Sequence, residues 1–223
     1  MARRPVVRIA RPVREPGSGG PLPKRCPALR VGLLGGSFNP AHEGHLAISV
    51  MALRRFRLHR VRWLVSPGNP LKPERGMASF RDRFASAGRI AGHPRIEVSN
   101  LEQRLGTRYT IDTVRHLQRN RHERQLWLMG ADLLAEFQRW RRWREVFRAV
   151  PIAVFDREPY VYRALAGPAA SVFGFGRRPD RAAPRLIEMV PPAWMFMRLR
   201  RHPVSSTAIR EGRAAGEEME ERP

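Results

Sequence analysis

Short apolar segments alternate with longer segments of helical periodicity along most of this 223-residue chain, and this alternation limits its possible folds most strongly. The expected strands are residues 30–34, 62–65, 95–98, 126–129 and 152–155. The expected helices are residues 44–56, 79–91 and 110–121, with inner stripes of Leu46, Val50 and Leu53 in the first and Ile111, Val114 and Leu117 in the last. Such alternation produces βαβ units and a parallel sheet covered on both faces. We therefore predict one α/β domain with a doubly wound, mostly parallel sheet and a ligand site at the carboxyl ends of its strands.

Composition separates both ends of the chain from its middle. Residues 1–28 contain six prolines, three glycines and seven basic side chains against one acid, which predicts a flexible basic arm. Residues 217–223 form a short acidic tail, which leaves residues 29–216 as the folded domain. The single cysteine, Cys26, excludes an internal disulfide framework and indicates a reducing, cytoplasmic compartment. The mainly apolar stretch at residues 46–53, which includes Ser49, is too short to cross a bilayer.

The formal net charge of +22 would normally suggest a nucleic-acid partner. However, Lys24 and Lys72 are the only lysines among 42 basic residues, and binding to phosphate gives no reason to exclude lysine. So lopsided a ratio is typical of a GC-rich genome that favours arginine codons. We predict no nucleic-acid and no membrane partner. A basic nucleic-acid-binding protein, with steep salt dependence, is the alternative from another class.

The loop between the first strand and the first helix carries the main chemical signal, Gly-Gly-Ser-Phe-Asn-Pro-Ala-His-Glu-Gly-His at residues 35–45. Gly35 and Gly36 let the backbone approach a ligand, while His42 and His45 are three residues apart and share a face on the first helical turn. Two imidazoles beside open backbone amides form a cradle for phosphate oxygens. Neither a dinucleotide fingerprint nor a Walker loop follows this strand, and residues 174–176 are interpreted as a plain loop.

This loop resembles the HxGH signature of the nucleotidyltransferases with a Rossmann-like core. Its longer form resembles that of the bacterial nicotinate-nucleotide adenylyltransferases, in which aspartate is commoner at the position of Asn39. The resemblance covers residues 30–212 and implies adenylyl transfer from ATP to nicotinate mononucleotide, giving deamido-NAD and pyrophosphate. It further implies that Mg²⁺ accompanies ATP, without a metal site of the protein's own. A phosphopantetheine adenylyltransferase, which shares the first loop, is the alternative within the superfamily.

A second phosphate grip is expected near the C-terminus, where hydroxyls stand at a helix start and Arg210 on its first turn. Alone, the segment indicates a capped helix; the resemblance implies that it holds the triphosphate. The resemblance implies catalytic roles for His42, His45, Lys72 and Arg210. It implies ATP contacts for Gly35, Gly36, Ser37, Phe38, His42, His45, Asp132, Ser205, Ser206, Thr207 and Arg210. It implies nicotinate mononucleotide contacts for Asn39, Lys72, Tyr109, Thr110 and Trp140.

Three smaller matches carry these last assignments. Asp132 follows a strand in Gly-Ala-Asp and resembles the family's Gly-x-Asp turn beside the ribose, although an ordinary strand-end turn has the same sequence. Tyr109 and Thr110 resemble a Ser-Tyr-Thr turn, with Arg108 in place of the usual small residue. Trp140 has the spacing of a tryptophan that stacks on the pyridine ring, but Trp140 and Trp143 can equally be core residues. Oligomeric state and selectivity between nicotinate and nicotinamide stay open.

Overall fold

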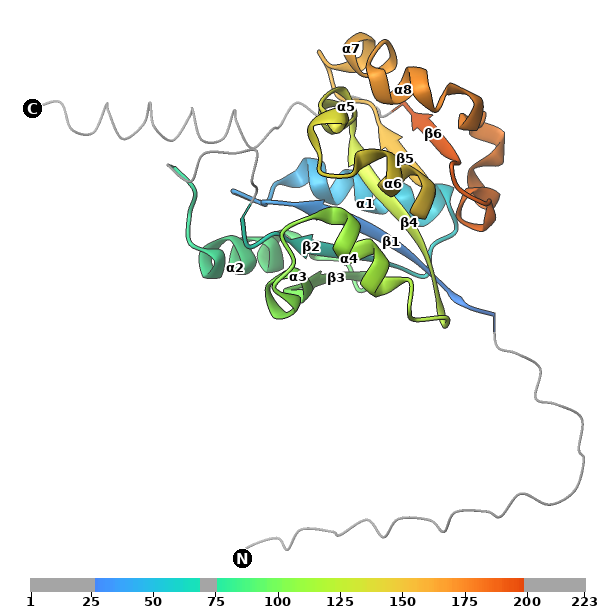
Figure 1. The fold of residues 1–223 in the computed structure, drawn as a ribbon. Coiled ribbons are helices and arrows are strands. Elements are labelled where there is room, and N and C mark those ends of the chain that lie inside the picture. The colour runs from blue at the N-terminus through green and yellow to red at the C-terminus, as the bar shows by residue number, and fades with distance from the viewer. Residues whose placement is uncertain (1–26, 69–75, 199–223) are drawn as a thin grey trace, which may run out of the picture.

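A six-stranded, entirely parallel sheet forms the centre of the protein, whose computed structural model describes residues 27–68 and 76–198 (Figure 1). The strands are β1 (Leu29–Gly36), β2 (Arg60–Val65), β3 (Ile96–Ser99), β4 (Glu123–Gly130), β5 (Ile152–Phe155) and β6 (Trp194–Met197). Their order across the sheet is β3-β2-β1-β4-β5-β6, and each pair of neighbours is parallel. The five predicted strands are confirmed, and β6 is an addition at one edge.

Helices connect the strands, and the longer ones were predicted. They are α1 (Glu43–Arg55), α2 (Phe80–Ile90), α3 (Leu101–Leu105), α4 (Thr110–Leu117), α5 (Ala131–Ala135), α6 (Trp143–Ala149), α7 (Val161–Leu165) and α8 (Pro168–Val172), with 3₁₀ turns η1 (Phe137–Arg139), η2 (Gly174–Gly176) and η3 (Asp180–Glu188). The start of α2 is fixed by Ser79, whose hydroxyl accepts a hydrogen bond from the Asp82 N–H at 3.1 Å. Residues 174–176, expected as a plain loop, form the short turn η2.

Two hydrophobic layers cover the sheet, as the doubly wound prediction requires. On one face α4, α5, α6 and α8 pack against side chains such as Leu33 and Trp127; on the other α1, α2 and η3 pack against Leu34 and Trp63. Figure 1 shows α4, α5 and α6 in front of the sheet and α1 behind it. Consecutive β1 residues therefore point into different layers, and both are apolar because both faces are buried.

The inner face of α1 differs in part from the predicted stripe. Leu53 is buried, but Leu46 and Val50 are only partly buried, and Ser49 and Ala52 occupy the centre of the contact. A buried hydroxyl needs a partner, and Ser49 has two: it accepts from the Trp63 indole N–H and donates to the His45 carbonyl. The stripe of α4, Ile111, Val114 and Leu117, is buried as predicted.

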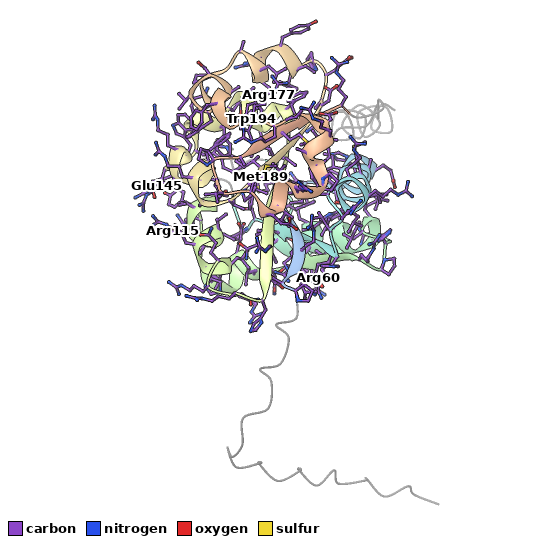
Figure 2. All side chains as sticks on the ribbon, turned by 90° about the vertical axis from the view of Figure 1, so that its right-hand side faces the viewer. Arg60, Arg115, Glu145, Arg177, Met189 and Trp194 are labelled. Atoms are coloured by element: carbon purple, nitrogen blue, oxygen red, sulfur yellow. The ribbon has the colours of Figure 1, made fainter. Side chains whose placement is uncertain are left out.

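The side of the molecule in Figure 2 shows a paired arginine, Arg115, and an arginine against a tryptophan ring, Arg177. Arg115 of α4 donates to Glu145 of α6 at 2.7 Å, and the Arg177 guanidinium lies 5.5 Å from the ring centroid of Trp194. These contacts join neighbouring elements at the surface, where each contributes little to stability. Within residues 27–68 and 76–198, no helix is both long and apolar enough to span a bilayer.

Candidate functional site

The candidate site lies where the strand order reverses, between β1 and β4. From β1 the chain continues through α1 to β2 on one side, whereas β4 and β5 lie on the other side. The connections therefore leave β1 and β4 towards opposite faces of the sheet. The carboxyl ends of these two strands form a topological switch point, where open α/β sheets generally bind their ligands. The histidine loop, residues 37–45, follows β1, and the Gly130–Asp132 turn stands at the end of β4. The fold therefore brings these two predicted motifs to the same edge of the sheet (Figure 1).

His42 and His45 form a reciprocal cap at the start of α1. His42 is the residue before the first turn, and its Nδ1 accepts from the Gly44 N–H at 3.1 Å. His45 reaches back, and its Nδ1 accepts from the His42 N–H at 3.2 Å. The ring centroids lie 4.0 Å apart. The two histidines thus satisfy amides that a helix leaves open, in the places where serine and glutamate usually stand.

This capping determines which imidazole nitrogen carries a proton. A neutral imidazole has one donor and one acceptor nitrogen, and Nδ1 is the acceptor in both rings. The proton therefore resides on Nε2 in the neutral form, and both Nε2 atoms are donors. Phosphate oxygens accept hydrogen bonds from such donors. The cap therefore suits the two histidines to phosphate binding, because it uses Nδ1 as the acceptor and leaves the proton on Nε2.

The His45 ring packs against the aromatic side chains of the core. Phe38 is buried, and its ring lies 4.7 Å from His45 and is stacked on Trp63 at 5.1 Å. Phe38 has a φ of 48°, the left-handed conformation that turns the chain from β1 towards α1. The expected contribution of Phe38 to a nucleotide site is therefore its backbone amide, because its side chain is part of the core.

Gly35 has a packing reason for lacking a side chain. A Cβ atom at Gly35 would lie 2.9 Å from two ring atoms of Trp127, closer than van der Waals contact allows. At Gly36 the nearest atom, in the Phe38 ring, would be 3.4 Å away. At Gly35 the missing side chain makes room for Trp127 of the neighbouring strand β4, whereas the approach of a ligand to this glycine pair stays a prediction.

We expect Gly35→Ala to lower the free energy of unfolding by about 1–3 kcal/mol, because the Trp127 ring must move inside a packed core. Gly36→Ala is the matched control, since it makes the same change in backbone entropy without the clash. We expect its free energy of unfolding to rise slightly, by about 0.5 kcal/mol, because alanine reduces the entropy of the unfolded chain. Urea unfolding of both variants measures the difference. Equal losses in the two variants would contradict the packing explanation.

Asn39 is engaged with the segment that leads into α2. Its amide nitrogen donates to the Gly76 carbonyl at 3.1 Å, and its oxygen accepts from the Ala78 N–H at 3.2 Å. An aspartate at this position would keep the acceptor but lose the donor. The asparagine is therefore suited to both groups that it meets here.

Asp132 folds back over the end of β4. A Cβ at Gly130 would lie 2.3 Å from Asp132 Oδ1, so only glycine leaves room for the carboxylate. Arg157, which follows β5, donates to Oδ2 at 2.9 Å. Oδ1 is buried and has no hydrogen-bond partner among the residues that the structure describes. Gly130 itself precedes the first turn of α5, so Asp132 does not cap that helix.

Of the two residues expected around the pyridine ring, Tyr109 contacts Arg141, the residue that follows Trp140. Tyr109 precedes the first turn of α4, and the Arg141 guanidinium lies 4.8 Å from its ring centroid. Trp140 directly follows η1 and is half-buried, with its ring 4.7 Å from that of Phe137. Trp143, in contrast, is 8% exposed and packs edge-on against Phe173. The two tryptophans therefore differ: Trp143 is a core residue, and Trp140 retains an exposed part.

A buried polar network lies beside the Tyr109–Thr110 turn. Thr113 donates to the Glu102 carboxylate at 3.0 Å, and Thr107 lies 3.1 Å from Thr113 between their hydroxyl oxygens. Burial raises the pKa of Glu102 from 4.5 to about 7, against the lowering effect of the Thr113 hydrogen bond. Sequence reasoning missed this network, since a glutamate on a short polar segment gives no sign of burial.

Glu102→Gln should change how stability depends on pH. The folded-state pKa lies above the unfolded value, so wild-type protein loses stability as pH rises from about 4.5 to about 7, by up to about 3 kcal/mol. Glutamine cannot titrate but can still accept from Thr113. Melting temperatures at pH 5, 6, 7 and 8 should therefore show the variant gaining on wild type as pH rises. Parallel curves would contradict a buried, titrating Glu102.

Comparison with known proteins gives the family. A cytidylyltransferase-like family model matches residues 33–212, most of the chain. The chain belongs to this family. Two relatives are a probable nicotinate-nucleotide adenylyltransferase of Gluconobacter oxydans, 53% identical over 184 residues, and one of a Bradyrhizobium strain (BTAi1), 48% identical over 183 residues. Each alignment covers 82% of this chain, with 94% of the first relative and 95% of the second.

A solved structure agrees with the fold of this cytidylyltransferase-like chain. It is a Plasmodium falciparum nicotinic acid mononucleotide adenylyltransferase complexed with NaAD, which aligns with a TM-score of 0.57 at 14% identity and covers 82% of this chain and 83% of its own. The predicted α/β fold and the resemblance to nicotinate-nucleotide adenylyltransferases are confirmed by these matches.

Some predicted site residues lie outside the residues that the structure describes. They are Lys72, Ser205, Ser206, Thr207 and Arg210, together with residues 1–26 of the predicted arm and the tail at 217–223. Gly36, His42 and His45 are brought together after β1, and Asp132 lies at the neighbouring strand end. Sequence reasoning did not identify Arg83, Arg157 or Glu102, which support the loops around this edge.

Proposed function

We propose that this protein transfers the adenylyl group of ATP to nicotinate mononucleotide, releasing pyrophosphate and giving deamido-NAD. One observation carries the proposal: two imidazoles with Nε2 donors stand at the start of α1, His42 as the N-cap and His45 on the first turn. The relatives at about half identity support the choice of substrate. The family match favours a nucleotidyltransferase over a basic nucleic-acid-binding protein.

The chemistry requires positioning more than acid–base catalysis. The attacking oxygen belongs to the 5′-phosphate of the mononucleotide, which is already ionised at neutral pH, so no general base is needed. Bringing two anions into line is the difficulty, and hydrogen-bond donors overcome it by neutralising charge in the transition state. Backbone amides from Gly36 to Phe38 would bind phosphate oxygens, while His42 and His45 would donate to the α-phosphate and the leaving pyrophosphate. No covalent intermediate is expected.

The ATP end would use groups that follow both β1 and β4. The buried Asp132 Oδ1 is suited to accept from a ribose hydroxyl, because Arg157 already occupies the other oxygen. Ser205, Ser206, Thr207 and Arg210 would hold the β- and γ-phosphates, and Lys72 would approach the phosphates from the loop after β2. Mg²⁺ would be carried by the triphosphate oxygens, consistent with a described site that offers mainly N–H donors, and would neutralise their charge.

The mononucleotide would lie on the α4 side of the site. We propose that Trp140 stacks on the pyridine ring, with Tyr109 and Thr110 at its carboxylate and Asn39 beside the phosphates. The half-buried Trp140 ring supports this role, since a core tryptophan would have no free face. Residues 29–216 would form the whole catalytic domain, and the cytoplasmic location stays a prediction.

Pyrophosphate release tests the proposal directly. With ATP, nicotinate mononucleotide should support rapid release, nicotinamide mononucleotide should give the degree of selectivity, and phosphopantetheine should support none. Omitting Mg²⁺ in each reaction tests the proposed metal. Release with phosphopantetheine but with neither mononucleotide would identify the protein as a phosphopantetheine adenylyltransferase. If none of the three acceptors supported release, both assignments would be refuted.

A further inference from the structure

Arg83 on α2 joins three separate segments at the edge of the candidate site. Its side chain is 2% exposed, and all its described hydrogen bonds go to backbone carbonyls. Nη1 donates to the Ser37 carbonyl at 2.6 Å and to the Ser66 carbonyl at 2.8 Å. Nη2 donates to Pro67 at 3.1 Å, and Nε to Ala78 at 3.0 Å. The carbonyls belong to the histidine loop, the exit of β2 and the approach to α2.

Stability alone is a poor reason for this arrangement. The four acceptors are neutral, and no carboxylate pairs with Arg83 among the described residues. Burial accordingly lowers the pKa of its guanidinium. Removing a cation from water without an anionic partner is costly, so buried charges are weak devices for stability. What the guanidinium does provide is geometry, because its planar fork holds several acceptors in fixed directions.

Asn39 strengthens the same connection from the histidine loop. Its amide holds the Gly76 carbonyl and the Ala78 N–H, while Arg83 holds the Ala78 carbonyl. Asn39 and Arg83 thus both form hydrogen bonds with the backbone at Ala78. Ser37 is bound directly by Arg83, one residue before Phe38, whose ring supports His45.

We propose that Arg83 is a positioning residue for adenylyl transfer, fixing the loop of Ser37, His42 and His45 against the exit of β2 and the start of α2. This inference rests on the function proposed above. Arg83 acts through the loop and is not required to contact a substrate. Its removal should therefore impair the chemical step more than the binding of either substrate.

The kinetic test uses Arg83→Lys and Arg83→Gln, with Arg81→Gln on the exposed side of α2 as the control. At a temperature where circular dichroism shows folded protein, both Arg83 variants should lose about tenfold in kcat, with each KM changed by less than about threefold. Lysine should not restore activity, because one ammonium cannot bind carbonyls of three segments in the same directions. Arg81→Gln should retain wild-type kcat.

Coupling to His45 separates positioning from a merely structural role. If Arg83 acts through the histidine loop, Arg83→Gln should reduce kcat by less than about twofold in a His45→Ala background. Independent, multiplicative losses would overturn the proposal. Full kcat per folded molecule in both Arg83 variants would overturn it too, as would failure of both to fold, which would make Arg83 a stability residue.

Hydrogen exchange provides a readout that does not depend on activity. In Arg83→Gln, the amides of residues 37–45 should exchange about tenfold faster than in wild type, while those of α4 stay unchanged. Unchanged exchange in the loop would overturn the positioning role. If wild-type protein released no pyrophosphate with ATP and nicotinate mononucleotide, the proposed function would fail, and the exchange result would still decide whether Arg83 fixes the loop.

Discussion

His45→Ala should lower kcat by on the order of 10²-fold or more, because it removes a donor that acts mainly in the transition state. The Nδ1 of His45 is occupied by the His42 N–H, so Nε2 is the donor that the substitution eliminates. Steady-state release of pyrophosphate at saturating ATP and nicotinate mononucleotide measures the loss.

The substitution also removes half of the helix cap, and a second variant separates the two effects. Losing the cap should cost about 1 kcal/mol of stability in His45→Ala. Glutamine commonly fills this position of a capping box, so His45→Gln should retain the cap and a melting temperature close to wild type. Both variants should nevertheless be slow. Turnover near wild type in either variant would contradict the role assigned to this imidazole.

The fold was largely predictable because its signal is repeated along the chain. The strands β1, β2, β4 and β5 each contain a short apolar run bounded by polar or turn residues, and α4 has a clear inner stripe. The missed elements lack these cues. The helices α5, α7 and α8 have five residues each, too few to establish periodicity, and β6 follows closely on two prolines. These three helices and this strand are therefore stabilised by tertiary packing rather than by a local sequence pattern.

The site residues that lie close together in the sequence were predictable, whereas the residues that position them from distant parts of the sequence were not. His42 and His45 lie within one turn, so their spacing alone indicates a shared face. The partners of Arg83 lie as far as 46 positions away. One signal was available, since Arg83 precedes Ala87 by four residues and therefore lies on the buried face of α2. A charge on a buried face requires polar partners, although the sequence does not say which.

Trp140→Ala should weaken nicotinate mononucleotide much more than ATP. Losing an aromatic stack on a heterocycle costs about 1–3 kcal/mol, so the KM for the mononucleotide should rise by roughly one to two decades. The KM for ATP should change little, because the ATP groups are proposed at the ends of β1 and β4 and at residues 205–210. Two-substrate kinetics, with a melting curve for each protein, measure both quantities.

Trp143→Ala is the matched control, since it removes the same ring three residues along the chain. Trp143 is 8% exposed in the core, so its loss should cost about 3–5 kcal/mol of stability and leave the ratio of the two KM values unchanged. Trp140 is half-buried against Phe137, so its loss should cost less. A Trp140→Ala protein that is strongly destabilised, with unchanged relative KM values, would show that Trp140 is a core residue like Trp143. The identity of the second substrate would then rest on the likeness to relatives and on the Tyr109–Thr110 turn alone.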